Sequence, residues 1–134
     1  MIVEISTDKS KLQLDVIHGF LTESYWAKGR TYDEVKTSIE HCLCFGVYIN
    51  KKQIGFARIA TDYTVFAYLM DVFILPEYRG KGYSKQLIDA VIKDKKLQNC
   101  SVWMLKTADA HGLYKQYGFT ELKHPDKVME RLLK

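Results

Sequence analysis

Two glycines and two cationic side chains occupy one short stretch of the chain, Arg79-Gly80-Lys81-Gly82-Tyr83-Ser84. The stretch follows an apolar segment that ends at Pro76 and precedes a segment with helical periodicity, so we expect a strand, a turn and a helix start. Backbone N–H groups in the first turn of a helix have no partner within the helix, and the helix dipole adds positive character there. Such a turn, flanked by cations, favours binding of a phosphate group.

Other interpretations of the two glycines remain open. They can serve turn geometry alone, because glycine adopts left-handed backbone conformations easily. A Walker phosphate loop needs G-x-x-x-x-G-K-[ST], which Gly80-Lys81-Gly82 does not supply. A dinucleotide-binding fingerprint needs a third glycine where Lys85 stands, and an N-terminal βαβ unit. The strands before this turn instead resemble an antiparallel meander, so both alternatives are weak.

Asp71 is a second candidate for chemistry, because it interrupts an otherwise apolar strand. A buried carboxylate is costly unless it is paired or used in function. Asp71 is therefore either a general base or substrate anchor, or a structural ion-pair partner, for instance of Arg58 on the adjacent strand. Strand alternation predicts that Asp71 shares one face with Leu69 and Phe73.

The rest of the chain must position these residues, and its hydrophobic periodicity alternates between helix and strand. Residues 12–21 have apolar side chains at helical spacing, and Thr31-Tyr32-Asp33-Glu34 has the form of a capping box that begins a second helix. A turn at 50–52 joins two strands as a hairpin. The predicted order is strand 2–5, helix 12–21, a helix from 31, strands 43–50, 53–60 and 66–75, a helix after Gly82, strand 101–105, and a helix over 108–117 closed by Gly118. Residues 128–133 are compatible with either a strand or a helix. This order predicts one α+β domain over residues 1–134.

Composition narrows the function classes. The 134 residues suffice for one domain with its own core, and the formal net charge of +4 is dispersed, so neither a nucleic-acid partner nor a small basic RNA-binding domain is favoured. No apolar run approaches the ~20 residues that span a bilayer, and the N-terminus lacks a signal-peptide pattern, so we expect a cytoplasmic protein with no membrane partner. The three cysteines are odd in number and lack a C-x-x-C pair, which favours reduced core residues over a metal site.

Two motifs resemble those of a known family. Residues 79–84 resemble the R-G-x-G-x-[GA] pyrophosphate loop of GNAT acetyltransferases, although Ser84 stands where Gly or Ala is usual. The preceding residues 72–76 are similar to the family's fourth strand, whose backbone pairs with the pantetheine arm. Residues 107–119 resemble the segment N-x-x-A-x-x-L-Y-x-x-x-G-F, with Thr107 in place of Asn. The element order also matches, so the resemblance implies the GNAT fold, a central mixed and mostly antiparallel sheet flanked by helices.

The resemblance also implies an activity: direct transfer of an acetyl group from the cosubstrate acetyl-CoA to an amine, within a ternary complex. Tyr114, the tyrosine of the second motif, would protonate the leaving thiolate, with core packing as its alternative role. A strand N–H near Phe73 would polarise the carbonyl oxygen. The amine proton would go to Asp71, Asp109, His111 or water. The implied contacts with acetyl-CoA lie at Val72, Phe73, Ile74, Arg79, Gly80, Lys81, Gly82, Tyr83, Ser84 and Thr107.

The acceptor site of this fold lies between the first two helices and the central strands. Tyr25, Trp26 and Arg30 fall in that region. Aromatic walls can hold an alkylamine by cation–π contact and Arg30 can bind a carboxylate, or these residues simply pack the loop. The resemblance thus implies a small-molecule or peptide amine as substrate and leaves a homodimer open. The alternative is a non-catalytic acyl-CoA-binding or sensor module, against which Tyr114 argues.

Overall fold

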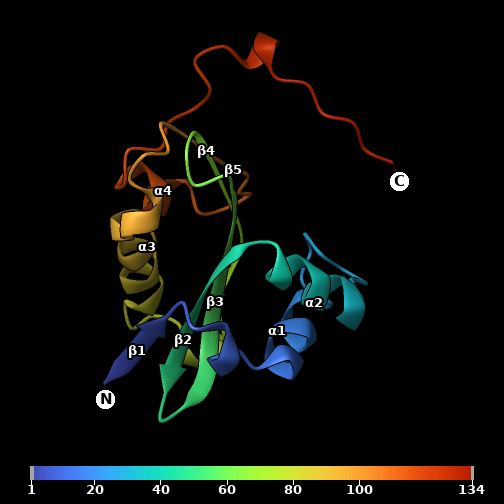
Figure 1. The fold of residues 1–134 in the computed structure, drawn as a ribbon, viewed down its shortest axis with the longest axis vertical. Helices are drawn as coiled ribbons and strands as arrows, with labels where there is room; N and C mark the ends of the chain where they lie inside the picture. The colour runs from blue at the N-terminus through green and yellow to red at the C-terminus, as the bar shows by residue number, and fades with distance from the viewer. Residues whose placement is uncertain (1, 134) are drawn as a thin grey trace.

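The structure is a computed structural model that describes residues 2–133, and these form a five-stranded sheet with helices on both faces (Figure 1). The strand order is β1-β2-β3-β4-β5, with three antiparallel pairs and a parallel pair between β4 and β5. The strands are β1 (Val3–Ser6), β2 (Leu43–Ile49), β3 (Lys52–Thr61), β4 (Phe66–Ile74) and β5 (Val102–Leu105). The α-helices are α1 (Leu14–Leu21), α2 (Tyr32–Glu40), α3 (Tyr83–Lys93) and α4 (His111–Lys115). The predicted α+β architecture, with a mixed and mostly antiparallel sheet, is confirmed.

Two apolar cores lie on opposite faces of the sheet. On one face, α1 and α2 pack through residues such as Ile17 and Val35 against Phe56 and Phe73. On the other face, α3 packs mainly through Leu87 and its neighbours, and α4 contributes Tyr114. No helix within residues 2–133 combines the length and the apolar character that spanning a bilayer would need.

Local sequence accounts for several element boundaries. The capping box of α2 is present, since the Thr31 hydroxyl accepts from the Glu34 N–H at 3.1 Å and the Glu34 carboxylate accepts from the Thr31 N–H at 2.8 Å. The hairpin between β2 and β3 turns on two residues rather than three, because Asn50 and Lys51 both adopt positive φ and Lys52 already belongs to β3. Helix α4 ends at Lys115, two residues before its predicted end, and Gly118 follows in the next turn with a φ of 88°.

A β-bulge at Asp71 divides β4 into two halves. Arg58 of β3 pairs with Met70, whereas Phe56 pairs with Phe73, so β4 carries one extra residue, and Asp71 has a φ of 55°. The predicted alternation is therefore wrong for Leu69, which packs in the core beneath α3, whereas Phe73 packs in the core beneath α1 and α2. Because of the extra residue, the side-chain alternation of β4 changes phase at the bulge, so Leu69 and Phe73 point to opposite faces of the sheet.

The pairing of β4 with β5 is also incomplete. The parallel register runs from Phe66 opposite Val102 to Leu69 opposite Leu105, and it stops there. Beyond Leu69, β4 continues to Ile74 while the chain after Leu105 turns away toward α4. The strand thus has an outer edge, over residues 70–74, that β5 does not cover.

Two predictions near the C-terminus need correction. Helix α4 begins at His111 rather than at 108: its first turn is closed by the Tyr114 N–H, which donates to the Ala110 carbonyl at 3.2 Å, and the Thr107 hydroxyl accepts from the Ala110 N–H at 3.0 Å in the bend before it. Residues 128–133, expected as a strand or a helix, form neither, and between residues 120 and 133 the structure has only a short 3₁₀ turn, Pro125–Lys127. In Figure 1 this tail extends away from the sheet.

Candidate active site

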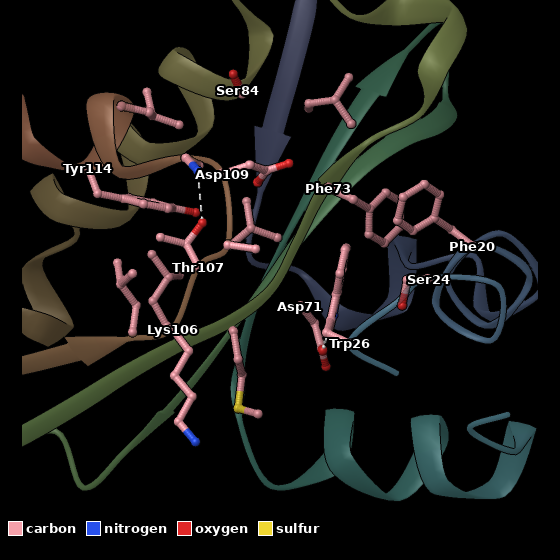
Figure 2. Close-up of a pocket in the computed structure, with 18 of the residues that line it drawn as sticks. Phe20, Ser24, Trp26, Asp71, Phe73, Ser84, Lys106, Thr107, Asp109 and Tyr114 are labelled. Carbon is pink, nitrogen blue, oxygen red and sulfur yellow. Dashed lines mark hydrogen bonds between the residues drawn. The ribbon is translucent and has the colours of Figure 1, made fainter. Parts of the chain in front are cut away.

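A cavity of about 990 Å³ opens where β4 and β5 part, a size typical of small-molecule sites (Figure 2). Four parts of the chain meet around it. They are the loop after α1, the second half of β4, the glycine turn with the start of α3, and the segment from β5 to α4. Their lining residues include Phe20, Ser24, Tyr25, Trp26 and Arg30; Tyr68 to Ile74; Tyr78, Arg79, Gly80, Gly82, Tyr83 and Ser84; and Leu105 to Ala110 with Leu113 and Tyr114. The cavity therefore joins both sequence motifs to the predicted acceptor loop.

The glycine turn has the geometry of an anion site. Gly80 and Gly82 adopt φ values of 79° and 81°, and a Cβ at either position would meet no protein atom within 4 Å. Glycine is thus required here by the left-handed backbone, not by crowding within the chain. Helix α3 starts at Tyr83 with no side-chain cap and no acidic residue in its first turn, so its first N–H groups have no protein acceptor from a cap. Gly82, Tyr83 and Ser84 line the cavity.

The two cations of the turn are placed differently. Arg79 lines the cavity, its Nε donates to the Ile74 carbonyl at 2.9 Å, and its guanidinium lies 5.9 Å from the ring centre of Phe20. Lys81 is exposed and is not among the residues that line the cavity. Arg79 therefore braces the turn against the end of β4, and Lys81 contributes charge from outside the cavity.

Tyr114 lies on the opposite wall. Its side chain is 8% exposed, and Figure 2 shows the ring pointing from α4 toward Thr107. Burial, with smaller contributions from Asp109 and Tyr25, raises the pKa of Tyr114 to about 12. The hydroxyl therefore stays protonated throughout the neutral range and can donate a hydrogen bond. Tyr114 also packs edge-on against Phe119, at a centroid distance of 5.9 Å, so its ring does belong to the core.

Three other predicted residues of this segment have distinct placements. Thr107 lines the cavity, and its hydroxyl oxygen accepts a hydrogen bond from the Ala110 N–H. Asp109 lines the cavity, and its carboxylate points into it in Figure 2. His111 is exposed at the start of α4 and is not among the lining residues. Of the two candidates near α4 for accepting a proton, the cavity therefore includes Asp109.

Asp71 is the centre of a buried ion-pair cluster. Its side chain is 1% exposed, and its Oδ2 accepts from Arg30 Nη1 at 2.7 Å and from Arg58 Nε at 2.8 Å. Its Oδ1 accepts from Trp26 Nε1 at 3.0 Å. Arg58 also donates to the Cys42 sulfur at 3.4 Å. The ion pair with Arg58 considered from sequence is thus present, joined by Arg30 and Trp26 from the acceptor loop.

Phe20 and Tyr68 are lining residues that the sequence analysis did not single out. Phe20 stacks on Phe73 with ring centres 4.1 Å apart, and Trp26 lies beside it at 6.0 Å. Phe20 lies beside the buried stripe of α1 and not within it. An aromatic residue in such a position needs a further surface to cover it, and this was the signal that the sequence offered. Tyr68 gave no such signal, since it follows the ordinary pattern of a strand.

Comparisons with known proteins agree with this geometry. A family model described as an acetyltransferase (GNAT) domain matches residues 40–121. A Gibberella zeae protein named as an acetyltransferase is 28% identical over 146 aligned residues, covering 91% of this chain and 81% of that protein. A crystal structure from Xanthomonas campestris, described as an acetyltransferase of the GNAT family, is 47% identical with a TM-score of 0.96, covering 99% of this chain and 94% of that one. An acetyltransferase from Clostridium acetobutylicum, solved with acetyl-CoA, shares the fold at 18% identity and a TM-score of 0.72, covering 98% and 96% of the two chains.

Proposed function

This chain belongs to the GNAT family of acetyltransferases, and we propose that it transfers the acetyl group of acetyl-CoA directly to an amine within a ternary complex. The observation that carries the proposal is one cavity that joins the glycine turn, the uncovered edge of β4 and Tyr114. The turn offers backbone donors for a pyrophosphate, the edge offers backbone partners for a pantetheine arm, and the tyrosine offers a hydrogen bond to the leaving sulfur. An acetyl-CoA molecule laid along this path brings its thioester between β4 and α4.

In this proposal the thioester carbonyl is polarised by an N–H of β4. The Leu75 N–H donates to Ile54 at 2.8 Å, and Phe73 pairs with Phe56, so these positions direct their N–H groups at β3. Successive N–H groups of a strand point to opposite sides, and Val72 and Ile74 therefore direct theirs at the open edge. Either can donate to the carbonyl oxygen as negative charge develops on it, which selectively stabilises the transition state.

The leaving thiolate is stabilised by Tyr114. Its hydroxyl remains protonated at neutral pH because the pKa of Tyr114 is raised to about 12. A thiol has a pKa of about 8.5, well below this, so the hydroxyl acts chiefly as a hydrogen-bond donor to sulfur. Overall, the amine nitrogen forms a bond to the acetyl carbon and loses a proton, the carbon–sulfur bond breaks, and the thiolate takes a proton from solvent to become the coenzyme thiol.

We assign removal of the amine proton to Asp109, directly or through water. Its carboxylate lines the cavity and has no ion-pair partner within residues 2–133. Asp71 instead accepts three hydrogen bonds through its two oxygens, which leaves it poorly placed to take a proton. Asp71 is therefore a positioning residue in this mechanism, because it fixes the bulge that sets the direction of the β4 edge.

The test is release of the coenzyme thiol from acetyl-CoA across a panel of small amines, amino acids and peptide N-termini. Amine-dependent release above the background hydrolysis is expected for at least one acceptor, and product mass should rise by one acetyl group. Tight acetyl-CoA binding with no release for any acceptor would favour the alternative, a non-catalytic acyl-CoA sensor. Absence of acetyl-CoA binding would contradict both.

A further inference from the structure

The acceptor half of the cavity has an unusual distribution of charge around Asp71. Two guanidinium groups, from Arg30 and Arg58, contact a single carboxylate, so the cluster carries one net positive charge. The carboxylate side chain is 1% exposed, whereas the Arg30 side chain is 21% exposed and lines the cavity. Both residues line the cavity, and the cation is the more exposed of the two to a ligand that enters this region.

Arg30 also has donors to spare. Its Nη1 donates to Asp71, and within residues 2–133 its Nε and Nη2 form no hydrogen bond. A guanidinium with unused N–H groups beside an apolar wall is suited to a planar or tetrahedral anion. The wall is supplied by Phe20, Tyr25 and Trp26, which line the same cavity.

From this arrangement we infer that the acceptor amine carries an anionic group, a carboxylate or a phosphate, which Arg30 binds while the amine faces the thioester. The inference rests on the proposed acetyl transfer and names its substrate class. A second cation at the Arg30 end of the acceptor is disfavoured, because Asp71 is buried there and already contacts two guanidinium groups. The apolar wall further favours an acceptor with a hydrophobic or aromatic body between its two polar ends.

The experiment compares four probes of one shape: p-(aminomethyl)benzoate, p-(aminomethyl)phenylphosphonate, p-(aminomethyl)benzamide and p-xylylenediamine. Their reactive amines are alike, and the group at the far end is an anion, a neutral amide or a cation. Titration calorimetry of the wild-type protein in excess coenzyme A should give the anions at least ~10-fold tighter binding than the amide, and the diamine the weakest. Whether benzoate or phosphonate is bound more tightly distinguishes a carboxylate from a phosphate site.

Arg30→Gln should abolish the difference between benzoate and benzamide. Lys28→Gln is the matched control, because Lys28 is an exposed cation of the same loop that is not among the lining residues. It should preserve the difference. Equal affinities for anion, amide and diamine in the wild type, no binding by any of them, or a preference that survives Arg30→Gln would each overturn the inference.

The two proposals can fail separately. Thiol release with other acceptors, together with no preference for the anionic probes, removes the substrate class and leaves acetyl transfer intact. Anion-selective binding without thiol release for any acceptor removes the activity and leaves an anion site. If Arg30→Gln fails to fold in a thermal melt, the four-probe comparison on the wild type still decides the inference.

Discussion

The indole N–H of Trp26 donates to the Asp71 carboxylate at 3.0 Å, although the two residues are 45 positions apart in the chain. Arg30 reaches the same carboxylate at 2.7 Å. Together they attach the loop between α1 and α2 to the bulge of β4. The wall that would hold the acceptor is thereby fixed relative to the strand that would hold the thioester.

Asp71→Asn should lower both the stability of the protein and its rate of acetyl transfer. Asparagine tolerates the left-handed backbone at this position about as well as aspartate, so the change removes charge and leaves two guanidinium groups without their counterion. Breaking a buried pair costs about 3–5 kcal/mol of unfolding free energy, measurable by urea denaturation. Turnover should fall more than acetyl-CoA affinity does. Glu4→Gln, which removes an exposed ion pair with Lys11, is the control and should change little. An unchanged urea midpoint for Asp71→Asn would refute the structural role of the cluster.

Gly82→Asp should weaken acetyl-CoA binding, which we expect at micromolar affinity in the wild type. The new carboxylate would stand at the start of α3, where the free N–H groups favour an anion. Gly118→Asp is the matched control, because Gly118 also has a left-handed φ and open space around it but does not line the cavity. Calorimetry should show a loss of at least ~10-fold in the first variant and little change in the second. Equal affinity in wild type and Gly82→Asp would remove the turn from the binding site.

Tyr114→Phe should lower turnover by at least ~10-fold while acetyl-CoA binding changes little, since it removes a hydrogen bond made to the departing sulfur. The ring and its contact with Phe119 remain, so stability should be nearly preserved. Tyr117→Phe is the control, because the Tyr117 hydroxyl donates to the Lys85 carbonyl and does not line the cavity. Steady-state kinetics decide: a Tyr114→Phe enzyme with wild-type turnover would reduce this residue to core packing.

Asp109→Asn should lower turnover most strongly at neutral pH and less at high pH, where more of the acceptor amine is already deprotonated. The same change removes a negative charge beside Tyr114 and should bring the pKa of that tyrosine closer to its ordinary value. A pH series of thiol release and an ultraviolet titration of tyrosine ionisation measure the two effects. A rate reduced equally at every pH would contradict the assignment of Asp109 as base.

Tyr48→Phe should stabilise the protein by about 1 kcal/mol at neutral pH, because the Tyr48 hydroxyl is the buried side-chain polar atom without a partner in residues 2–133. Burial raises the pKa of Tyr48 to about 12, so this tyrosine binds its proton more tightly when folded than when unfolded. Titration of Tyr48 therefore leaves the free energy of unfolding unchanged below the unfolded pKa of about 10 and lowers it as the pH rises from 10 to 12. The free energy of unfolding, measured by chemical denaturation, should fall less steeply between pH 10 and 12 for Tyr48→Phe than for the wild type. Equal slopes would disprove the effect.

Local patterns gave most of the fold. The capping box at Thr31, the apolar stripe of α3 and the glycine turn act over a few residues, so their outcomes can be inferred from spacing alone. The two motifs placed Gly82 and Tyr114 in one predicted acetyl-CoA site, and both residues line the same cavity.

What the sequence missed depends on contacts between distant segments. Alternation places Leu69, Asp71 and Phe73 on one face, and no local residue signals the extra position that separates Leu69 from the other two. The Arg30 and Trp26 partners of Asp71 come from a loop whose path is set by the packing of α1 against α2. The start of α4 at His111 was also missed, because the local sequence around Thr107 and Ala110 is equally compatible with a capped helix that starts at 108.

Along residues 70–74, β4 has no strand paired to its outer edge, because β5 pairs with β4 only as far as Leu69. If the pantetheine arm pairs with that edge, acetyl-CoA completes the sheet, and part of its binding energy becomes folding energy. The amide hydrogens of Val72 and Ile74 should then exchange rapidly with solvent in the free protein and slowly in the complex, while those bonded to β3 change far less. The apparent melting temperature should also rise with acetyl-CoA concentration, which makes thermal shift a screen for cosubstrates that needs no knowledge of the acceptor.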